Sequence, residues 1–526
     1  MAKAPHKKMR VLKRTSFASR DAGSRRGAVG DWTAPRVSNE TRAEVERLVA
    51  QDRGADLAAN NWLAGSLLAA MQYNVIGEGL RPQAQVPAKE LGITDEQAVE
   101  LNRQFEWIFS RWAEKPDVRG HSSFGEMQMV ALRTLLTYGE IVHLPVMLSE
   151  SERKARALPY SLAVQAVSPL RLRTPSYLRN EADVLDGIRF DEHGMPVSYF
   201  IACPAADGSG GMLLPRDDTA EFIEVPARTL HRPNVLHLFV RRDDEQIRGE
   251  SAFSNSAALY RYVDDAIRFE LEGQNASAKY SLFIERSDRM SVMDGVKVEL
   301  NPATGNEEYY TEVDGAMVMY GNPGEKPQMI ASNRPSNNWA GLVNLGMGGA
   351  AGTWGLSRLS ADRNYERVNY SSARAAQNGD WKVFNWMRGF MGRHYCQVFY
   401  EAVLEEAYLR GEWTPPKGAP DFYDARSLWT SAQWIGPARG FMDPVKEIQA
   451  TVMAVDNHLV TRHEAVAEYG RDFDDMVVTL MDEHEKMKPL LGNDESLSMR
   501  GGTASPDAAP GESSGGSANK KDGDEE

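Results

Sequence analysis

The sequence predicts an α+β fold, with helices and strands in separate stretches of the chain. Helix-start signals and helical periodicity fill the first 140 residues, short apolar runs occupy residues 141–240, and helical periodicity returns after residue 250. Strands that follow one another without alternating helices favour a mixed or antiparallel sheet over a doubly wound one. The 526 residues leave room for roughly three or four domain-sized regions.

The N-terminal stretch carries strong helix signals. A helix is predicted over residues 40–73, interrupted near Gly54. Two capping boxes, Thr94–Gln97 and Ser123–Glu126, open further helices, because in each the hydroxyl and the side chain three residues on satisfy free backbone donors. The second of these helices is predicted to end near Gly139. The apolar side chains expected to face inward are Leu101, Phe105, Ile108, Phe109 and Trp112 in the first, and Met127, Val130, Ala131 and Leu135 in the second.

The middle of the chain has the pattern of β-strands, with short apolar runs bounded by Pro, Gly and Asp. The runs are Ile141–Met147, Ser161–Val167, Val197–Ala202 and Val235–Val240. A helix is then predicted over residues 252–280, strand-like sequence over 281–330, and a helix from about Trp339 to Trp354.

The longest predicted helix begins after Asn369 and runs to about Arg410, with apolar residues at three- and four-residue spacing. Glycine inside a helix costs roughly 1 kcal/mol relative to alanine, so its three glycines predict a kink or close packing. They are Gly379, Gly389 and Gly392. Helices resume at Asp443-Pro444, a cap followed by a proline suited to the first turn, and a third capping box opens at Thr461.

Composition is that of a soluble globular protein, with 42% hydrophobic and 25% charged residues. No apolar run reaches the roughly 18 residues of a membrane span, and the basic N-terminus lacks the apolar stretch of a secretory signal. Cys203 and Cys396 are too few for a disulfide framework, so a reducing cytosol suits the chain. The net charge of −14 differs from the basic excess of a protein that grips phosphates.

Charge is unevenly distributed. Residues 1–36 hold ten basic and two acidic side chains, and residues 501–526 are rich in Gly, Ser, Ala and Pro with a terminal acidic cluster. Both ends are predicted to be disordered. The basic arm has two interpretations: a solvated tail, or an arm that touches DNA or an acidic assembly partner.

Several short patterns resemble catalytic or cofactor motifs but lack the context that those motifs need. Gly346–Ala351 matches G-x-G-x-x-A inside a predicted helix, and we interpret it as small residues that let helices of adjacent subunits approach. Gly511–Gly515 matches the nucleophile elbow but lies in the low-complexity tail. The sequence has no P-loop, its histidines from His458 to His484 lack zinc-site spacing, and its carboxylates from Asp264 to Glu272 are typical of a solvated helix. We therefore predict no enzymatic activity, cofactor or metal.

Two longer segments are the most informative of all, and neither looks catalytic. They are Asn369-Tyr370-Ser371-Ser372-Ala373-Arg374 and the stretch Trp434–Glu447, which contains Gly436-Pro437-Ala438-Arg439-Gly440 and Asp443-Pro444. On a purely local interpretation, Ser371 or Ser372 caps a helix and Arg374 pairs nearby. Trp434 then fills a core, and Lys446 and Glu447 contact a helix start.

Taken in order with three further blocks, these segments resemble the lambda-type portal proteins of tailed bacteriophages over roughly residues 40–492. The N-terminal block is Asp56–Asn61 with Asn74–Leu80, the central block is Gln246–Gly249, and the C-terminal block is Thr461–Glu464 with Tyr469–Asp472. The signature residues are Gln246, Arg248, Gly249, Asn369, Tyr370, Ser371, Ser372, Arg374, Trp434, Asp443, Pro444, Lys446 and Glu447.

The resemblance implies a portal fold with wing, stem helices, clip and helical crown, assembled as a ring. The implied divisions are a basic arm (1–37), a wing, helical then β-rich (38–250), a first stem helix (251–280), a clip (281–335), a second stem helix (336–356), a tunnel loop (357–371), a long kinked helix with wing return (372–440), a crown (441–492) and an acidic tail (493–526).

The implied function is a dodecameric channel at one capsid vertex for DNA packaging and ejection. An acidic wall suits a protein through which DNA slides, because tight phosphate contacts would hold the DNA still; it equally suits a soluble enzyme. The implied partners are further copies of the chain, double-stranded DNA, the terminase large subunit, head-completion or connector proteins, and coat and scaffold proteins, with no membrane. The chain is expected in the virion after synthesis in the bacterial cytoplasm. Arg358, Arg363 and Arg367 are the expected DNA contacts, and another virion structural protein, of coat or tail, is the alternative.

Overall fold

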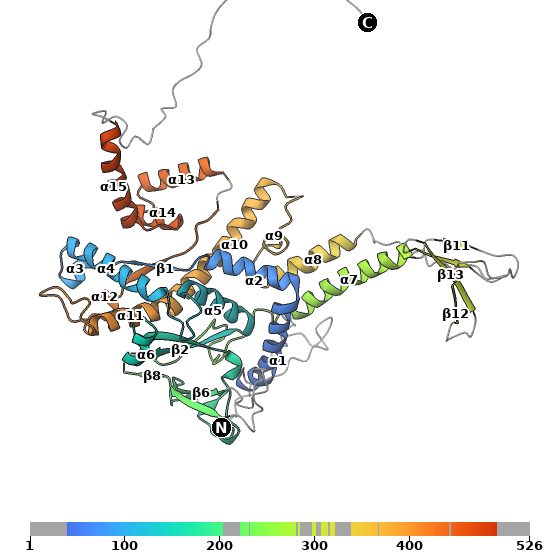
Figure 1. Ribbon diagram of the computed structural model, residues 1–526, viewed down its shortest axis with the longest axis horizontal. Coiled ribbons are helices and arrows are strands. Elements are labelled where there is room, and N and C mark those ends of the chain that lie inside the picture. Colours follow the sequence, from blue (N-terminus) through green and yellow to red (C-terminus); the bar gives the residue numbers. More distant parts are fainter. Residues whose placement is uncertain are drawn as a thin grey trace, which may run out of the picture.

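The computed structural model describes residues 39–203, 221–230, 232–279, 282–284, 297–300, 307–313, 316–320, 338–366, 368–440 and 443–491. The predicted basic arm and acidic tail lie outside these ranges. Helices and strands share the described chain, so the prediction of a mixed fold is confirmed. Figure 1 shows a body of helices and strands from which a helical arm projects to one side, with the C-terminal helices standing above the body.

Five helices and one short strand form the first part of the body. They are α1 (Asn39–Asn60), α2 (Trp62–Val75), β1 (Arg81–Ala84), α3 (Ala88–Leu91), α4 (Asp95–Ala113) and α5 (Phe124–Tyr138). The interruption expected near Gly54 lies instead at Asn61, whose side chain accepts hydrogen bonds from two amides in the first turn of α2. Gly54 lies within α1, where a methyl group would contact the Thr137 carbonyl oxygen at 2.6 Å. The glycine therefore serves close packing.

Both predicted capping boxes are present at the starts of α4 and α5, and α5 ends at Gly139 with a left-handed backbone. The predicted inward face of α4 is buried, but that of α5 is wrong at one position. Val130 is 54% exposed, whereas Gln128 is buried and exchanges two hydrogen bonds with the backbone of Leu80. A buried glutamine satisfied by a neighbouring loop is invisible to a hydrophobic pattern.

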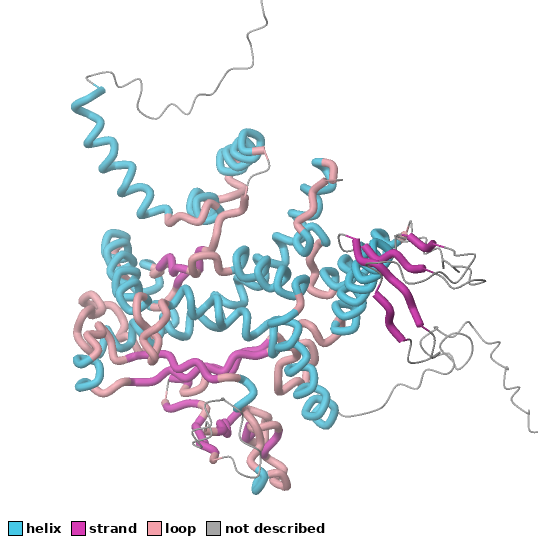
Figure 2. Tube along the Cα trace, turned by 45° about the vertical axis from the view of Figure 1, so that its right-hand side comes forward, coloured by secondary structure: helices cyan, strands magenta, loops and turns pink. Residues whose placement is uncertain are grey.

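Strands fill the lower part of the body, and Figure 2 shows the longer ones running beneath a layer of helices. A three-stranded antiparallel sheet has the order β10-β2-β3, and a four-stranded antiparallel sheet has the order β4-β5-β6-β7. Their bounds are β2 (Glu140–Met147), β3 (Leu162–Val167), β4 (Val184–Leu185), β5 (Ile188–Phe190), β6 (Pro196–Ala202), β7 (Phe222–Pro226) and β10 (Leu236–Phe239). The four predicted strands correspond to β2, β3, β6 and β10.

Short elements complete this region. They are α6 (Glu150–Ala155), the 3₁₀ turns Pro169–Arg171 and Ser176–Leu178, and the paired strands β8 (Arg228–Thr229) and β9 (Arg232–Pro233).

Two packed helices, α7 (Ala257–Lys279) and α8 (Trp339–Gly352), form an arm that projects from the body (Figure 1). Strands β11 (Leu282–Ile284), β12 (Lys297–Leu300), β13 (Glu307–Val313) and β14 (Ala316–Tyr320) form a sheet at its tip, in the order β11-β14-β13-β12. A methyl group on Gly346 would meet Val263 at 2.5 Å, and one on Gly349 would meet Leu259 at 3.3 Å. The close approach at these two glycines is thus made with α7 of the same chain; an approach of adjacent subunits at this segment stays a prediction.

The predicted long C-terminal helix is present, and its regular hydrogen bonding is interrupted at Gly392, one of the three glycines expected to cause a kink or close packing. α10 (Tyr370–Met391) continues through a π-helical turn (Gly392–Cys396) into α11 (Gln397–Leu409). A methyl group on Gly392 would lie 3.0 Å from Trp434. Close packing and a helix irregularity therefore coincide at Gly392, whereas methyl groups on Gly379 and Gly389 would have no neighbour within 4 Å.

The main core lies between this long helix and the helices α4 and α5. The Phe124 ring stacks on Tyr395 at 5.8 Å and meets the edge of Phe109 at 5.6 Å, while Trp112 packs against Phe399. All five rings are at least 97% buried. Because Phe124 and Tyr395 lie far apart in the sequence, this core joins the N-terminal helices to the long C-terminal helix.

The remaining elements are one short helix before the long helix and the elements that follow it. They are α9 (Arg358–Asp362), α12 (Arg426–Trp429), β15 (Ala432–Ile435), α13 (Pro444–Asp456), α14 (Arg462–Glu468) and α15 (Phe473–Leu491). β15 pairs antiparallel with β1, which joins the segment after the long helix to the N-terminal helices. The predicted caps are present, since Asp443 caps α13 and the Thr461 capping box opens α14.

Candidate functional site

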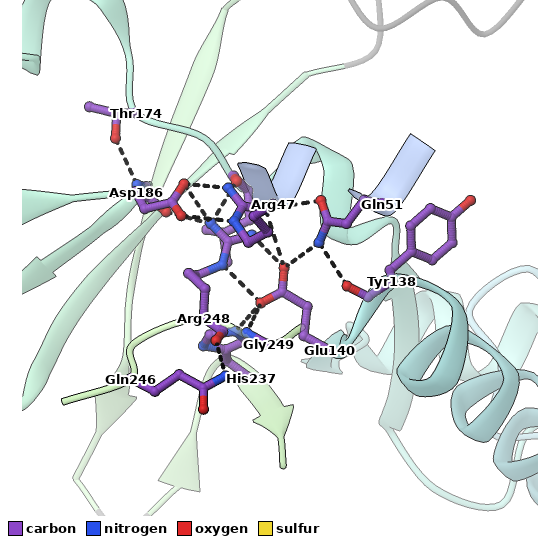
Figure 3. A network of polar contacts seen from close by, with 12 residues as sticks. Arg47, Gln51, Tyr138, Glu140, Thr174, Asp186, His237, Gln246, Arg248 and Gly249 are labelled. Atoms are coloured by element: carbon purple, nitrogen blue, oxygen red, sulfur yellow. Dashed lines mark hydrogen bonds and ion pairs between the residues drawn. The ribbon is translucent and has the colours of Figure 1, made fainter. Parts of the chain in front are cut away.

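The central signature Gln246–Gly249 contributes to a cluster of buried charges. Arg248 donates two parallel hydrogen bonds to Glu140, from Nε at 2.8 Å and from Nη2 at 2.5 Å (Figure 3). Both side chains are fully buried. Glu140 is the first residue of β2, and it directly follows Gly139, whose left-handed backbone ends α5. This sharp junction places the Glu140 side chain in the cluster. A bidentate pair of this kind fixes both the distance and the orientation of its partners.

A second ion pair packs against the first. Arg47 of α1 donates to Asp186 from Nη2 at 2.5 Å, and Arg248 reaches the same carboxylate at 3.2 Å. His237 Nε2 lies 2.9 Å from Glu140, and Gln51 links Arg47 to the end of α5. Two arginines face two carboxylates, so the cluster carries no net charge when His237 is neutral, which offsets the cost of burial.

The protonation states follow from these contacts. Burial alone would raise the pKa of Glu140, but the charge of Arg248 and hydrogen bonds from Arg248 and His237 lower that pKa well below its usual range. Burial lowers the pKa of His237, and Glu140 opposes that shift only in part. A carboxylate whose pKa falls on folding stabilises the fold above its ordinary pKa, and this contribution is lost in acid.

Gly249 brings the backbone itself into the cluster. Its amide donates to Glu140 Oε2 at 3.2 Å, and a methyl group on Gly249 would overlap the carbonyl oxygen of Gly139. The signature thus clamps the segment before α7 onto the junction of α5 and β2. Every charged group in the cluster has a protein partner, so the arrangement fits an internal joint and offers no reacting atom to a substrate. Among the described residues no group of His, Cys, Asp and Glu is arranged to hold a metal ion.

The adjacent His143 makes the fold sensitive to acid. His143 is buried beside the Tyr395 hydroxyl at 3.0 Å, and burial lowers its pKa from 6.5 to about 4. As the pH falls, the unfolded chain takes up this proton first, so the free energy of unfolding declines between about pH 6.5 and pH 4, by about 3 kcal/mol from this residue.

We therefore expect His143→Gln to lose about 3 kcal/mol less stability than the wild type between pH 7 and pH 4. Urea unfolding at the two pH values, at one protein concentration, measures the difference. His193→Gln is the matched control, because it makes the same replacement at an exposed histidine. Equal losses in the wild type and His143→Gln would contradict this account.

The two longer signatures meet at the start of α10. Asn369 caps this helix by accepting a hydrogen bond from the Ser372 amide at 2.8 Å, so the cap expected at Ser371 or Ser372 is wrong. Asparagine is a stronger cap because its side-chain oxygen reaches the third amide from an extended backbone. Arg374, one turn further, is exposed and its charge helps to lower the pKa of Asp443, after the hydrogen bonds from Lys446.

The described residues 434–440 of the second signature contact both α10 and α11. Trp434 Nε1 donates to Gln397 at 3.1 Å, Arg439 bonds Asn378, and Gln377 donates to the Gly440 carbonyl at 3.2 Å. At its end, Lys446 pairs with Asp443 at 2.8 Å. The helix-start contacts predicted for Lys446 and Glu447 are present, since the Glu447 amide also donates to the Asp443 carbonyl.

The three arginines expected to touch DNA are not equivalent. Arg358 begins α9 and is engaged, with Nη1 2.7 Å from Asn344 of α8 and 3.1 Å from Asp362. Arg363 ends α9 in a left-handed conformation and its side chain is exposed. Arg367 lies outside the described residues. The segment around α9 is anchored by Asp380, which accepts hydrogen bonds from the amide and hydroxyl of Ser357 and from the Ser360 hydroxyl at 2.5–2.7 Å.

Sequence reasoning singled out Arg248 and Gly249 but missed their partners. Glu140, Arg47 and Asp186 lie far from the Gln246–Gly249 signature in sequence. One signal was available for Glu140, a charged residue directly after a helix-ending glycine and directly before the apolar run Ile141–Val142. A lone charge in such a place is typical of a buried pair.

Comparison with known proteins places this architecture in a class. The sequence profile of the family described as phage portal protein, lambda family, matches residues 25–388. The portal protein of Escherichia phage N15 is 26% identical over 476 residues, and portal protein B of Escherichia phage lambda is 25% identical over 470; each alignment covers 86% of both chains. Among solved structures, a chain in the neck of a native gene transfer agent particle aligns with 11% identity and a TM-score of 0.36 over 81% of this chain and 98% of its own.

The class is therefore that of phage portal proteins, and this chain belongs to the lambda family of them. In the part of the chain that the structure describes, no helix combines the length and the apolar character needed to cross a bilayer.

Proposed function

We propose that this chain is one subunit of a dodecameric ring at a single capsid vertex, the channel through which double-stranded DNA is packaged and ejected. The observation that carries the proposal is the family match over residues 25–388. The arm formed by α7 and α8, with its sheet at the tip, supports it, because paired helices that leave the body are suited to line an axial channel (Figure 1).

The proposed divisions follow this arrangement. α7 and α8 act as the two stem helices, β11 to β14 as the clip, and α13 to α15 as the crown. The body from α1 to β10, together with α11 and β15, acts as the wing. Residues 357–371, which include α9, act as the tunnel loop beside the channel.

The proposed partners meet different parts of the ring. The clip docks the terminase large subunit during packaging and head-completion or connector proteins afterwards, while coat and scaffold proteins surround the wing. The protein is made in the bacterial cytoplasm and resides in the virion at the portal vertex. Its net charge of −14 supports weak contact with sliding DNA, since few fixed phosphate contacts are then made.

Negative-stain electron microscopy of the purified protein, with mass measurement of the same sample, tests this function. Rings of twelve or thirteen subunits around a hole about as wide as a DNA duplex support it. Shells or tubes would favour a coat or tail component instead. A compact monomer that turns over nucleotide would overturn it.

Arg363→Glu is expected to reduce packaged DNA at least about threefold while rings still form, because each copy exchanges an exposed positive charge beside the channel for a negative one. DNA protected from nuclease in particles carrying the variant is the measurement. Lys89→Glu on α3 is the matched control, since it makes the same charge change at an exposed site far from α9 in Figure 1. Unchanged packaging by Arg363→Glu would remove Arg363 from the proposed contacts.

A further inference from the structure

The helix α13 carries an apolar face that the described part of its own chain leaves uncovered. Val445, Ile448 and Val452 recur at spacings of three and four residues, which places them on one side of the helix. Their side chains are 65%, 46% and 51% exposed, and no residue of α13 is buried. The half-buried positions Glu447 and Thr451 lie on another side. Three exposed aliphatic side chains in a row mark a contact surface.

The C-terminal helices as a group lack a core. Of the side chains that the structure describes between Asp443 and His484, Ala465 alone is buried. Helices as short as α13 and α14 are marginal in water unless an apolar face is packed. A cover that the helices need for their own stability must be present permanently, which excludes a transient partner.

A second surface with exposed apolar side chains lies at the junction of these helices with the body. A groove of about 880 Å³ separates α4 from the first half of α15. Trp107 and Leu480 supply its exposed apolar side chains, whereas Phe109, Phe124 and Ile435 at its base are buried. Charged side chains also line the groove, among them Arg103, Glu106 and Glu483. No residue of α13 lines it. The described chain therefore has an apolar helix face and a groove with two exposed apolar side chains, Trp107 and Leu480, and the helix face does not cover the groove.

We propose that α13 of one copy docks into the groove between α4 and α15 of the next copy, with Val445, Ile448 and Val452 facing Trp107 and Leu480. This inference rests on the ring proposed above and names one of its subunit contacts. A head-to-tail contact between two different surfaces of one chain repeats from copy to copy and closes when the rotation is right. It gives both surfaces a permanent cover, which an occasional partner would not.

Charge insertion tests the contact. Ile448→Asp is expected to raise the protein concentration needed for ring assembly about tenfold or more, because a desolvated carboxylate opposes each docking event. Ala450→Asp is the matched control: it adds the same charge to an exposed position of α13 on the opposite side of the helix from Ile448. The thermal unfolding of isolated subunits should be alike in the two variants. Equal loss of rings in both would overturn the proposal.

Paired cysteines provide a second, independent test. Leu480→Cys combined with Ile448→Cys, or with Val452→Cys, in a chain that also carries Cys203→Ser should give a ladder of linked subunits when the assembled protein is oxidised. The single-cysteine variants should give none, and the buried Cys396 stays silent. If the wild type forms rings but no pair cross-links and Ile448→Asp assembles normally, the docking contact is wrong while the portal function stands. If the wild type forms no rings, the proposed function fails first.

Discussion

Arg248→Met is expected to destabilise the fold by about 3–5 kcal/mol, the largest effect of any side-chain truncation considered in this chain. Its guanidinium makes a bidentate contact with Glu140, and both groups are completely excluded from water. Removing it leaves the Glu140 carboxylate buried with His237 and the more distant Arg47, whose Nη1 lies 3.9 Å away. The cost is chiefly that of an uncompensated charge, not of a lost hydrogen bond.

A double-mutant cycle separates these terms. Urea unfolding at fixed protein concentration should show that Arg248→Met combined with Glu140→Gln costs less than the sum of the two single changes, because the double variant buries no lone charge at this pair. The exposed ion pair of Arg242 with Glu250, at 3.6 Å, offers the control, and Arg242→Met should stay within about 0.5 kcal/mol of wild type. A loss below about 1 kcal/mol for Arg248→Met would show that the cluster does not hold the fold.

Gly249→Ala is expected to cost about 2–4 kcal/mol, although it adds one methyl group. That methyl group would overlap the backbone of Gly139 and approach the Glu140 side chain at 2.9 Å, and the backbone cannot give way without breaking the Glu140 contacts. The variant should therefore unfold at lower urea and express poorly.

A glycine with free space around it supplies the opposite result. Gly379 lies within α10, where a methyl group would have no neighbour within 4 Å, so Gly379→Ala should raise stability by about 1 kcal/mol through helix propensity. Comparing the stabilities of Gly249→Ala and Gly379→Ala separates the cost of a steric clash from the gain in helix propensity within one protein. Stabilisation by both changes would mean that the close approach at Gly249 is relieved at little cost.

Local features could be predicted from the sequence where the partners lie within one helical turn. The capping boxes at Thr94, Ser123 and Thr461 and the cap at Asp443 are all present. In each, the donor and acceptor are three residues apart, so no other part of the fold decides whether they meet. The wrongly predicted cap at the start of α10 is also a local matter. Asn369 and the serines that follow it can each cap a helix, and the asparagine is the cap in the structure.

The sequence by itself determined the mixed fold class, the ends of most helices, four of the strands and, through ordered signatures, the portal family. Only the tertiary structure decided the roles of Arg248, Gly249 and Gly346. Arg248 meets a glutamate 108 positions away, Gly249 touches the end of α5, and Gly346 packs on α7. Helix caps and hydrophobic periodicity depend on residues close together in the sequence. The role of a buried charge or of a glycine at a close contact depends on residues that only the tertiary fold places beside it.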